Sequence, residues 1–164
     1  MTDTIFQDWA ANAGNPKGRF VLAFFRLCQV IRRQPEPVWM LGIPVLALYV
    51  GLVHWVMGIE LDYQTQVGPG LRLYHGVGLV VHRSSVIGAN CTLRHGVTLG
   101  WQRENEGCPV LEDGVEVGVG AILLGPIRVG KGAMIGAASL VRHDVEAGSV
   151  VGGNPARVIR QRDA

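Results

Sequence analysis

An aliphatic residue recurs at every sixth position through the second half of this 164-residue chain. The positions that mark the repeat are Leu111, Val117, Leu123, Val129, Ile135 and Val141. A period of six matches neither the helical repeat of about 3.6 residues nor the simple two-residue alternation of a strand. It is typical of a parallel β-helix built from hexapeptides, in which each turn of chain stacks on the one before it.

The repeat begins earlier in the chain and is disturbed twice. It starts at Leu61 and loses its phase near Leu79 and Val80, where two extra residues are inserted. We expect these residues to form a small bulge at a corner of the coil. The second disturbance is the polar segment 101–109, which we interpret as a loop ejected from the solenoid. Loops of this kind often carry functional groups.

Charge and cysteine usage exclude several classes of protein. The net charge is only +2 and no basic run with interleaved aromatic residues is present, so a nucleic-acid partner is not expected. The first twenty residues contain acidic residues and lack a continuous apolar core, so we expect no cleavable signal peptide. The cysteines lack metal-type spacing, and a reducing compartment is the simplest interpretation. They are Cys28, Cys91 and Cys108.

Residues 1–59 differ from the rest and form a predicted helical, apolar segment. Residues 12–18 read as loop and turn, and a helix is expected from Arg19 to the prolines at Pro35 and Pro37. The segment 38–59 contains no Asp, Glu, Lys or Arg and is long enough to cross a bilayer. Gly42 and Pro44 interrupt it, so we favour a helix that lies on the membrane surface or is buried against partner subunits. The sequence leaves these two alternatives open.

The remaining domain boundaries follow from the repeat. Residues 60–152 are predicted to form the β-helix, and residues 153–164 a basic C-terminal tail. Within the β-helix, His75 lies just ahead of the first disturbance, where a corner can present a side chain outward. An imidazole titrates near neutral pH and can accept a proton from an alcohol. Glu60 comes fifteen residues earlier, nearly one coil below, and could orient the imidazole. A histidine exposed on a turn is the alternative.

Several motifs resemble serine O-acetyltransferases of the left-handed β-helix superfamily. The resemblance covers roughly residues 59 to 160 and is greatest to the short acetyltransferases of exopolysaccharide and colanic acid biosynthesis. It implies a mainly β fold, namely a left-handed parallel β-helix with a short N-terminal α-helical segment. The motifs that carry it are residues 68–81, Val86-Ile87-Gly88-Ala89-Asn90, Val97-Thr98-Leu99-Gly100, Ile127-Arg128-Val129-Gly130 and Gly153-Asn154-Pro155-Ala156-Arg157.

The resemblance also implies an acyl donor and a catalytic pair. Acetyl-CoA is the expected co-substrate, and His75 the expected general base, in a homotrimer or dimer of trimers with sites between adjacent β-helices. Glu60 stands where serine acetyltransferases place an aspartate that orients the histidine. Tyr74 replaces an aspartate that helps to hold the amino acid, and Cys108 replaces a second histidine of the acceptor pocket. Losing the anion removes a charge-assisted bond of about 1.5–3 kcal/mol, which favours a sugar hydroxyl over serine.

The resemblance places the pantetheine arm of the donor along a groove between coils. The expected contacts are Gly100, Trp101, Val119 and Ala137. Lys131, together with Arg142, Arg157 and Arg160, could reach the nucleotide phosphates, although each is equally well explained as a solvated charge. No metal is expected, because the zinc enzymes of this superfamily carry two histidines five residues apart and no such pair occurs among His75, His82 and His95.

These observations favour an acetyl-CoA-dependent O-acetyltransferase that acts by general-base transfer on a sugar of exopolysaccharide biosynthesis. Covalent catalysis by Cys108 is not expected, because no histidine lies near it in the sequence. One alternative is an L-serine O-acetyltransferase of cysteine biosynthesis. Another is a non-catalytic β-helix scaffold. The expected location is cytoplasmic, with or without contact between residues 20–59 and the inner face of the cell membrane.

Overall fold

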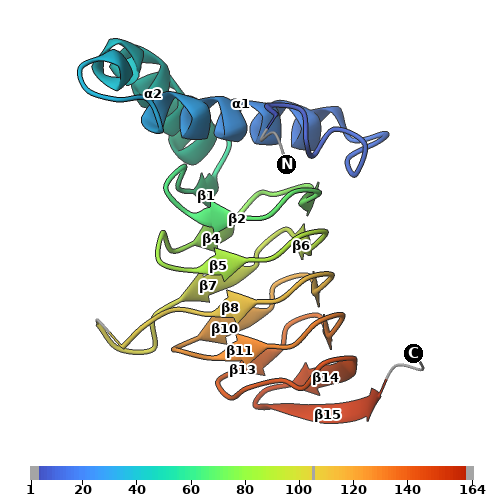
Figure 1. Cartoon of the computed structure of the whole chain (residues 1–164). Coiled ribbons are helices and arrows are strands. Elements are labelled where there is room, and N and C mark those ends of the chain that lie inside the picture. The colour runs from blue at the N-terminus through green and yellow to red at the C-terminus, as the bar shows by residue number, and fades with distance from the viewer. Residues whose placement is uncertain (1–3, 105, 162–164) are drawn as a thin grey trace.

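The computed structural model describes residues 4–104 and 106–161, and these form a parallel β-solenoid with helices across one end (Figure 1). Three sheets make the faces of the solenoid. The first sheet contains β1 (Ile59–Leu61), β4 (Leu79–Val81), β7 (Thr98–Gly100), β10 (Ile122–Leu124) and β13 (Leu140–Val141). The second contains β2 (Gln66–Val67), β5 (Val86–Ile87), β8 (Val110–Leu111) and β11 (Arg128–Val129). The third contains β3 (Arg72–Tyr74), β6 (Thr92–Arg94), β9 (Glu116–Val117), β12 (Met134–Ile135), β14 (Ser149–Gly153) and β15 (Ala156–Gln161).

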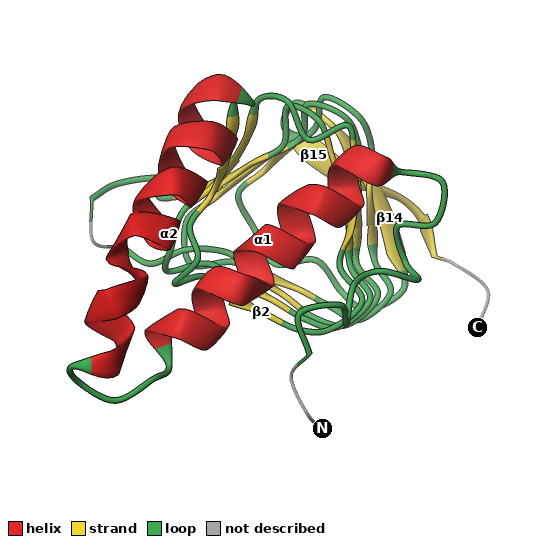
Figure 2. Cartoon of the chain, turned by 90° about the horizontal axis from the view of Figure 1, so that it is seen from above, coloured by secondary structure: helices red, strands yellow, loops and turns green. Residues whose placement is uncertain are grey.

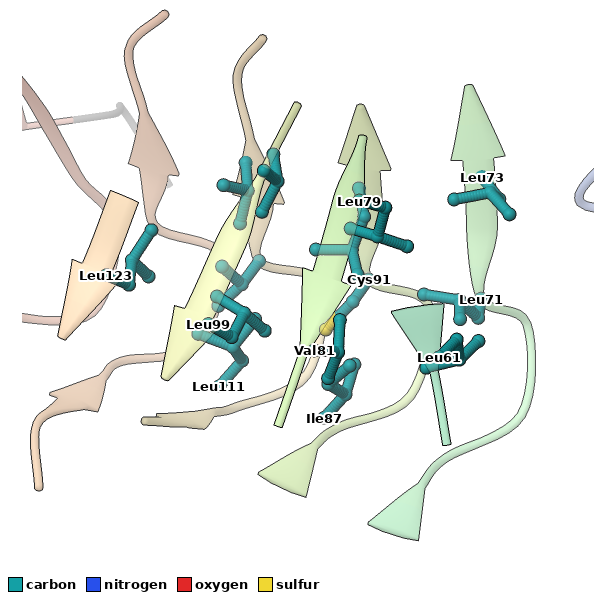
Figure 3. Close-up of a cluster of buried hydrophobic side chains, with 14 of the residues drawn as sticks. Leu61, Leu71, Leu73, Leu79, Val81, Ile87, Cys91, Leu99, Leu111 and Leu123 are labelled. Atoms are coloured by element: carbon teal, nitrogen blue, oxygen red, sulfur yellow. The ribbon is translucent and has the colours of Figure 1, made fainter. Parts of the chain in front are cut away.

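The residues of the six-residue repeat fill the interior of the solenoid. Leu111, Val117, Leu123, Val129 and Ile135 are all at most 1 % exposed. They stack in columns with the corresponding residues of earlier coils, as Figure 3 shows for Leu61, Val81, Leu99 and Leu123 among others. Each coil of a solenoid packs only against the coils directly before and after it, so the stacked coils bury their apolar side chains in one continuous interior. The predicted hexapeptide β-helix is therefore confirmed.

The first disturbance of the repeat lies at the corner that carries His75. Twenty residues separate the paired residues Tyr74 and Arg94, whereas eighteen separate Val80 and Thr98. The two extra residues therefore lie between Tyr74 and Val80, earlier than the expected place near Leu79 and Val80. Glycines at 76 and 78 have φ of +71°, and this backbone conformation lets the corner accommodate the insertion while β4 stays regular.

The second disturbance is the segment 101–109, which leaves the solenoid between β7 and β8. Twenty-four residues separate the paired residues Val86 and Val110, which is six more than an ordinary coil contains. Figure 1 shows the chain projecting from the side of the solenoid at this place. The described part of this loop returns to the body of the protein at Cys108, which is buried.

Helix α1 (Pro16–Arg32) begins three residues earlier than the sequence suggested. Residues 12–18 were expected to be loop and turn, but Asn15 caps the helix by accepting a hydrogen bond from the Gly18 N–H at 2.9 Å. Proline at the first helical position loses no helical hydrogen bond, so Pro16 starts the helix instead of delaying it. The helix ends before Pro35, as predicted.

The apolar segment after α1 is helical without a break despite Gly42 and Pro44. It comprises η1 (Val38–Gly42), α2 (Ile43–Tyr49) and η2 (Val50–Val56). These 19 residues have a mean hydropathy of 1.8, and by length and composition they could cross a membrane. Only 17 % of the most apolar part of this segment is buried in the structure. In the structure they lie across the end of the solenoid beside α1 (Figure 2). The Tyr49 hydroxyl donates a hydrogen bond to the Leu61 carbonyl at 2.7 Å, which joins the helix to the first coil.

The C-terminal segment was expected to be a basic tail, but residues 156–161 form strand β15. This strand pairs antiparallel with β14, so the two close the far end of the third sheet as a hairpin. Arg157 and Arg160 lie on this hairpin. The sequence Gly153-Asn154-Pro155 makes the turn, which explains why a segment with turn residues continues into a strand.

Candidate active site

One corner of the solenoid carries His75 and two of the predicted donor contacts. We call it the His75 corner; it is the column of turns that joins the third sheet to the first, and it contains His75, His95, Val119 and Ala137. Backbone hydrogen bonds connect successive turns of this column, from Gly120 N–H to the His95 carbonyl at 3.0 Å and from Ala138 N–H to the Val119 carbonyl at 2.8 Å. Neighbouring coils are about 4.8 Å apart. His75 therefore lies about 14 Å above Ala137 along one edge.

The turn conformation directs the His75 side chain away from the core. Its φ is +63°, which is uncommon for a residue other than glycine and is typical of special turns. The imidazole is exposed, and its ring centroid lies 5.7 Å from that of His95 in an edge-to-face arrangement. Among the described residues it makes no hydrogen bond. It is thus available to a substrate hydroxyl, as a general base must be.

Glu60 lies on the strand next to this corner. The N–H of Gly78 donates to the carbonyl of Gly58 at 2.7 Å, and Glu60 and His75 lie on the two chain segments that this bond joins. In the part of the chain that the structure describes, no hydrogen bond links the carboxylate to the imidazole. The orienting role of Glu60 therefore stays a prediction.

Glu60 also lines a cavity of about 340 Å³ on the outer face of the first sheet. Its wall combines apolar surface with two carboxylates, two imidazoles and a guanidinium. These side chains come from His54, Glu60, Asp62, His82 and Arg83, and the backbone near Thr98 and Gly100 completes the wall. Gly100, expected to contact the donor, thus lies beside Glu60 and on a different face from Ala137.

A second corner joins the first sheet to the second and brings together three residues that are distant in sequence. The thiol of Cys108 lies 3.1 Å from Nδ1 of His82, and the indole of Trp101 packs on the His82 ring with centroids 4.3 Å apart. The Ser84 N–H also donates to Nδ1 of His82 at 3.2 Å, so this nitrogen is the acceptor and the ring proton lies on Nε2. We call this group the His82 corner.

The contact between Cys108 and His82 does not follow from the sequence. The two are 26 residues apart, and the six extra residues of the loop bring Cys108 back to a place that spacing alone did not indicate. Burial raises the pKa of the Cys108 thiol above its ordinary value, and the nearby polar side chains of Ser85 and Trp101 oppose this only in part. A raised pKa leaves the sulfur protonated near neutral pH, so the pair resembles a thiol that donates to a histidine more than an activated nucleophile.

The other predicted contacts fall into two groups. Tyr74 lies beside His75 at the end of β3, with the guanidinium of Arg94 4.9 Å from its ring centroid. Val119 and Ala137 line a cavity of about 330 Å³ whose polar side is formed by Arg94 and Glu116. This cavity adjoins the His75 corner, because Val119 and Ala137 belong to both.

Within one chain, the residues that were predicted to contact the nucleotide phosphates of the donor do not lie at the His75 corner. Lys131 lies at the remaining corner, between β11 and β12, where its N–H donates to the Glu112 carboxylate at 2.8 Å. Arg142 contacts Gln102 of the ejected loop through Nε at 3.2 Å. Within residues 4–104 and 106–161, no group of three or more side chains could hold a metal ion.

Comparisons with known proteins identify the relatives of this chain, although no family model matches it. Serine acetyltransferase 4 of Arabidopsis thaliana is 39 % identical over 130 residues, which are 77 % of this chain and 37 % of the plant protein. The putative colanic acid biosynthesis acetyltransferase WcaB of Escherichia coli is 30 % identical over 158 residues, covering 94 % of this chain and 98 % of that protein.

The solved structures that are similar to this chain include serine acetyltransferases. A serine acetyltransferase from Brucella abortus in complex with coenzyme A has a TM-score of 0.81 and 26 % identity, covering 98 % of this chain and 68 % of that one. Soybean serine acetyltransferase complexed with serine has a TM-score of 0.80 and 28 % identity, covering 95 % of this chain and 68 % of that one. This chain spans 37 % and 41 % of the lengths of the two plant serine acetyltransferases that it matches, but nearly all of the colanic acid protein. The chain therefore belongs to the serine acetyltransferase-like family of hexapeptide-repeat acetyltransferases.

Proposed function

We propose that this protein transfers the acetyl group of acetyl-CoA to a hydroxyl group, with His75 as the general base. The observation that carries the proposal is the His75 corner, where an exposed imidazole stands above a groove that contains Val119 and Ala137. A related structure with 26 % identity was solved with coenzyme A. His75 removes the proton from the acceptor hydroxyl as its oxygen attacks the thioester carbonyl, and Glu60 stabilises the imidazolium. The proton then passes to the leaving sulfur.

The acceptor that we propose is a sugar of an exopolysaccharide. The match to the colanic acid protein extends over almost the whole of both chains, whereas the plant serine acetyltransferases are matched over less than half of their length. The cavity beside Glu60 supports a sugar, because carboxylates accept hydrogen bonds from hydroxyls and imidazole N–H groups donate to them. Next to His75, Tyr74 offers a phenol where a carboxylate would hold a substrate ammonium.

The acceptor assignment predicts a clear difference in a thiol-release assay. We expect purified protein to release CoA from acetyl-CoA with saccharide or nucleotide-sugar acceptors at least tenfold faster than with L-serine at equal concentration. Mass spectrometry of the product should show an added acetyl group on the sugar. Faster release of CoA with L-serine would favour L-serine, in place of a sugar, as the acceptor. Failure to bind acetyl-CoA at millimolar concentration would favour the non-catalytic scaffold.

We propose a homotrimer as the active assembly. Within one chain, Val119 and Ala137 lie at the His75 corner, while Gly100, Trp101 and Cys108 lie at or near the His82 corner on the other side of the first sheet. A trimer of side-by-side solenoids would set one corner of a protomer against the other corner of its neighbour. The two groups of predicted contacts would then line one groove between them.

We also propose that the protein is cytoplasmic and that its helical end rests on the inner face of the cell membrane. We call this surface the helical cap. Its exposed apolar side chains are Phe6, Trp9, Phe20, Val38, Met40, Leu41, Ile43, Leu48, Trp55 and Val56. An apolar groove of about 690 Å³ lies along α1 between the aromatic rings of Trp9 and Phe24. Apolar patches of this extent mark interaction surfaces.

The charges of the helical cap favour an anionic bilayer over a second copy of the cap. Lys17, Arg19 and Arg32 are cationic, and the one acidic side chain exposed among residues 4–58 is Glu36. Two such surfaces facing each other would repel, whereas anionic lipids attract them. Arg19 and Arg32 lie 4.8 and 4.1 Å from the ring centroids of Trp9 and Trp39, an arrangement of cation and aromatic ring that suits the lipid headgroup region.

Sedimentation with lipid vesicles tests whether the helical cap binds a membrane. Leu41 and Trp55 are 83 % and 85 % exposed, and replacing either with Ser should weaken binding to phosphatidylglycerol vesicles about tenfold, since burial of such side chains is worth about 1.5–3 kcal/mol. Ile159→Ser is the matched control, because Ile159 is 66 % exposed on β15 at the opposite end and should have no effect. Binding equally to neutral and anionic vesicles, or a change in oligomer size in place of vesicle binding, would contradict the proposal.

A further inference from the structure

His95 occupies the position directly beneath His75 on the His75 corner. It follows β6 as His75 follows β3, and these strands pair in parallel with Tyr74 opposite Arg94. The two imidazole centroids are 5.7 Å apart, with the ring planes at 75°. The next turn of the column carries Val119, one wall of the proposed donor groove. His95 therefore stands between the proposed base and the proposed binding groove of the acyl donor.

The two nitrogens of the His95 ring differ in their surroundings. Nδ1 is buried and has no hydrogen-bond partner among the described residues. Nε2 is not among the buried unpaired atoms of that part of the chain and makes no hydrogen bond there, so it reaches the surface. A proton on Nδ1 would leave a buried donor without an acceptor, which is costly. The favoured tautomer carries its proton on Nε2 and offers one N–H donor at the surface of the corner.

The neighbouring base and the buried Nδ1 both disfavour a second proton on the His95 ring. When His75 accepts the proton of the acceptor hydroxyl, it becomes a cation 5.7 Å from the His95 ring. A second proton on His95 would place like charges side by side and would bury an unpaired N–H at Nδ1. The proposed role therefore uses a His95 ring with a single proton, on Nε2, while the neighbouring imidazole accepts the proton of the acceptor. A neutral imidazole is known to act as such an electrophile in catalysis.

We propose that the Nε2–H of His95 donates a hydrogen bond to the thioester carbonyl oxygen of the acyl donor, and this inference rests on the proposed acetyl transfer. As the acceptor oxygen forms its bond to the carbonyl carbon, the C=O electron pair moves to the oxygen and the hydroxyl proton moves to His75. When that electron pair returns, the carbon–sulfur bond breaks and the sulfur takes the proton from His75. A donor aimed at the developing oxyanion lowers the barrier of both steps.

The alternative is that His95 only packs beneath His75, and two substitutions separate these roles. His95→Phe keeps a ring and removes the donor, whereas His95→Gln keeps an N–H donor and changes the shape. If the carbonyl is bound as proposed, His95→Phe should lower kcat about 100-fold while the KM for acetyl-CoA stays within about twofold. His95→Gln should retain at least ten times the kcat of His95→Phe. His143→Phe, an exposed histidine away from this corner, is the matched control and should match the unmodified protein.

The outcomes distinguish this inference from the proposed function. Gel filtration and thermal unfolding of each variant establish that the fold and assembly are kept. If the unmodified protein transfers acetyl groups and His95→Phe retains a kcat within threefold of it, the role of His95 is wrong and the proposed function stands. Equal losses in His95→Phe and His95→Gln would also reject the donor role. If the unmodified protein transfers no acetyl group above the level of His75→Ala, both proposals fail.

Discussion

Replacing His75 with alanine should lower the turnover number of acetyl transfer by about two to four orders of magnitude, because a positioned general base contributes about that factor. The loss should appear in kcat and leave CoA binding nearly intact, since the proposed donor groove is formed by later coils of the same corner. The rate of CoA release measures the first effect, and isothermal titration with CoA the second. Unchanged turnover would remove His75 from the mechanism.

The backbone at this position requires a second variant. His75 has a φ of +63°, and alanine adopts this left-handed conformation less readily than asparagine does. His75→Asn should therefore keep the corner and still lack a base. Both variants should show the same loss of turnover, whereas His143→Ala should show none. A large loss in His75→Ala with near-normal turnover in His75→Asn would mean that the turn, and not the imidazole, matters.

The repeat made most of the solenoid predictable. Leu111, Val117 and Leu123 mark a spacing that only stacked coils satisfy, so the strands and their buried faces followed from the sequence. The place of His75 at a corner also followed, because the phase of the repeat changes beside it. Its neighbour His95 did not, since their contact depends on a twenty-residue coil whose extra residues could not be assigned to one turn.

The six-residue repeat does not predict the contacts of the ejected loop or of the elements at the two ends of the solenoid. Nothing in the spacing of the loop indicates where Cys108 returns, so its contact with His82 was missed. The start of α1 depends on a side-chain cap by Asn15, and β15 depends on pairing with β14, where the hexapeptide pattern has already ended. In each case a single tertiary contact, and not a periodic pattern, decides the structure.

The N-terminal segment is attached to the solenoid by a buried ion pair. Asp8 and Arg26 have side chains that are both only 3 % exposed, and the Arg26 Nε donates to Asp8 Oδ2 at 2.8 Å. The guanidinium also donates to the carbonyls of Val67 and Gly68 at 2.8 and 2.7 Å. Asp8 Oδ1 in turn accepts from the Leu71 N–H at 2.9 Å. One pair of side chains thus connects the N-terminal segment, α1 and the first coil.

Asp8→Ala should therefore lower the free energy of unfolding by about 3–5 kcal/mol, because it leaves the Arg26 guanidinium buried without its counter-ion. For a chain of this size that corresponds to a fall in Tm of roughly 6–20 °C, measured by calorimetry or by circular dichroism. Glu106→Gln is the control, since its pair with Arg103 is exposed at 3.6 Å and should be worth about 0–1 kcal/mol. Removing the charge of Arg26 as well, in Asp8→Ala with Arg26→Met, should recover part of the loss. A double variant that is as unstable as the sum of the two single variants would show that the two charges act independently, and that the ion pair does not hold the cap on the solenoid.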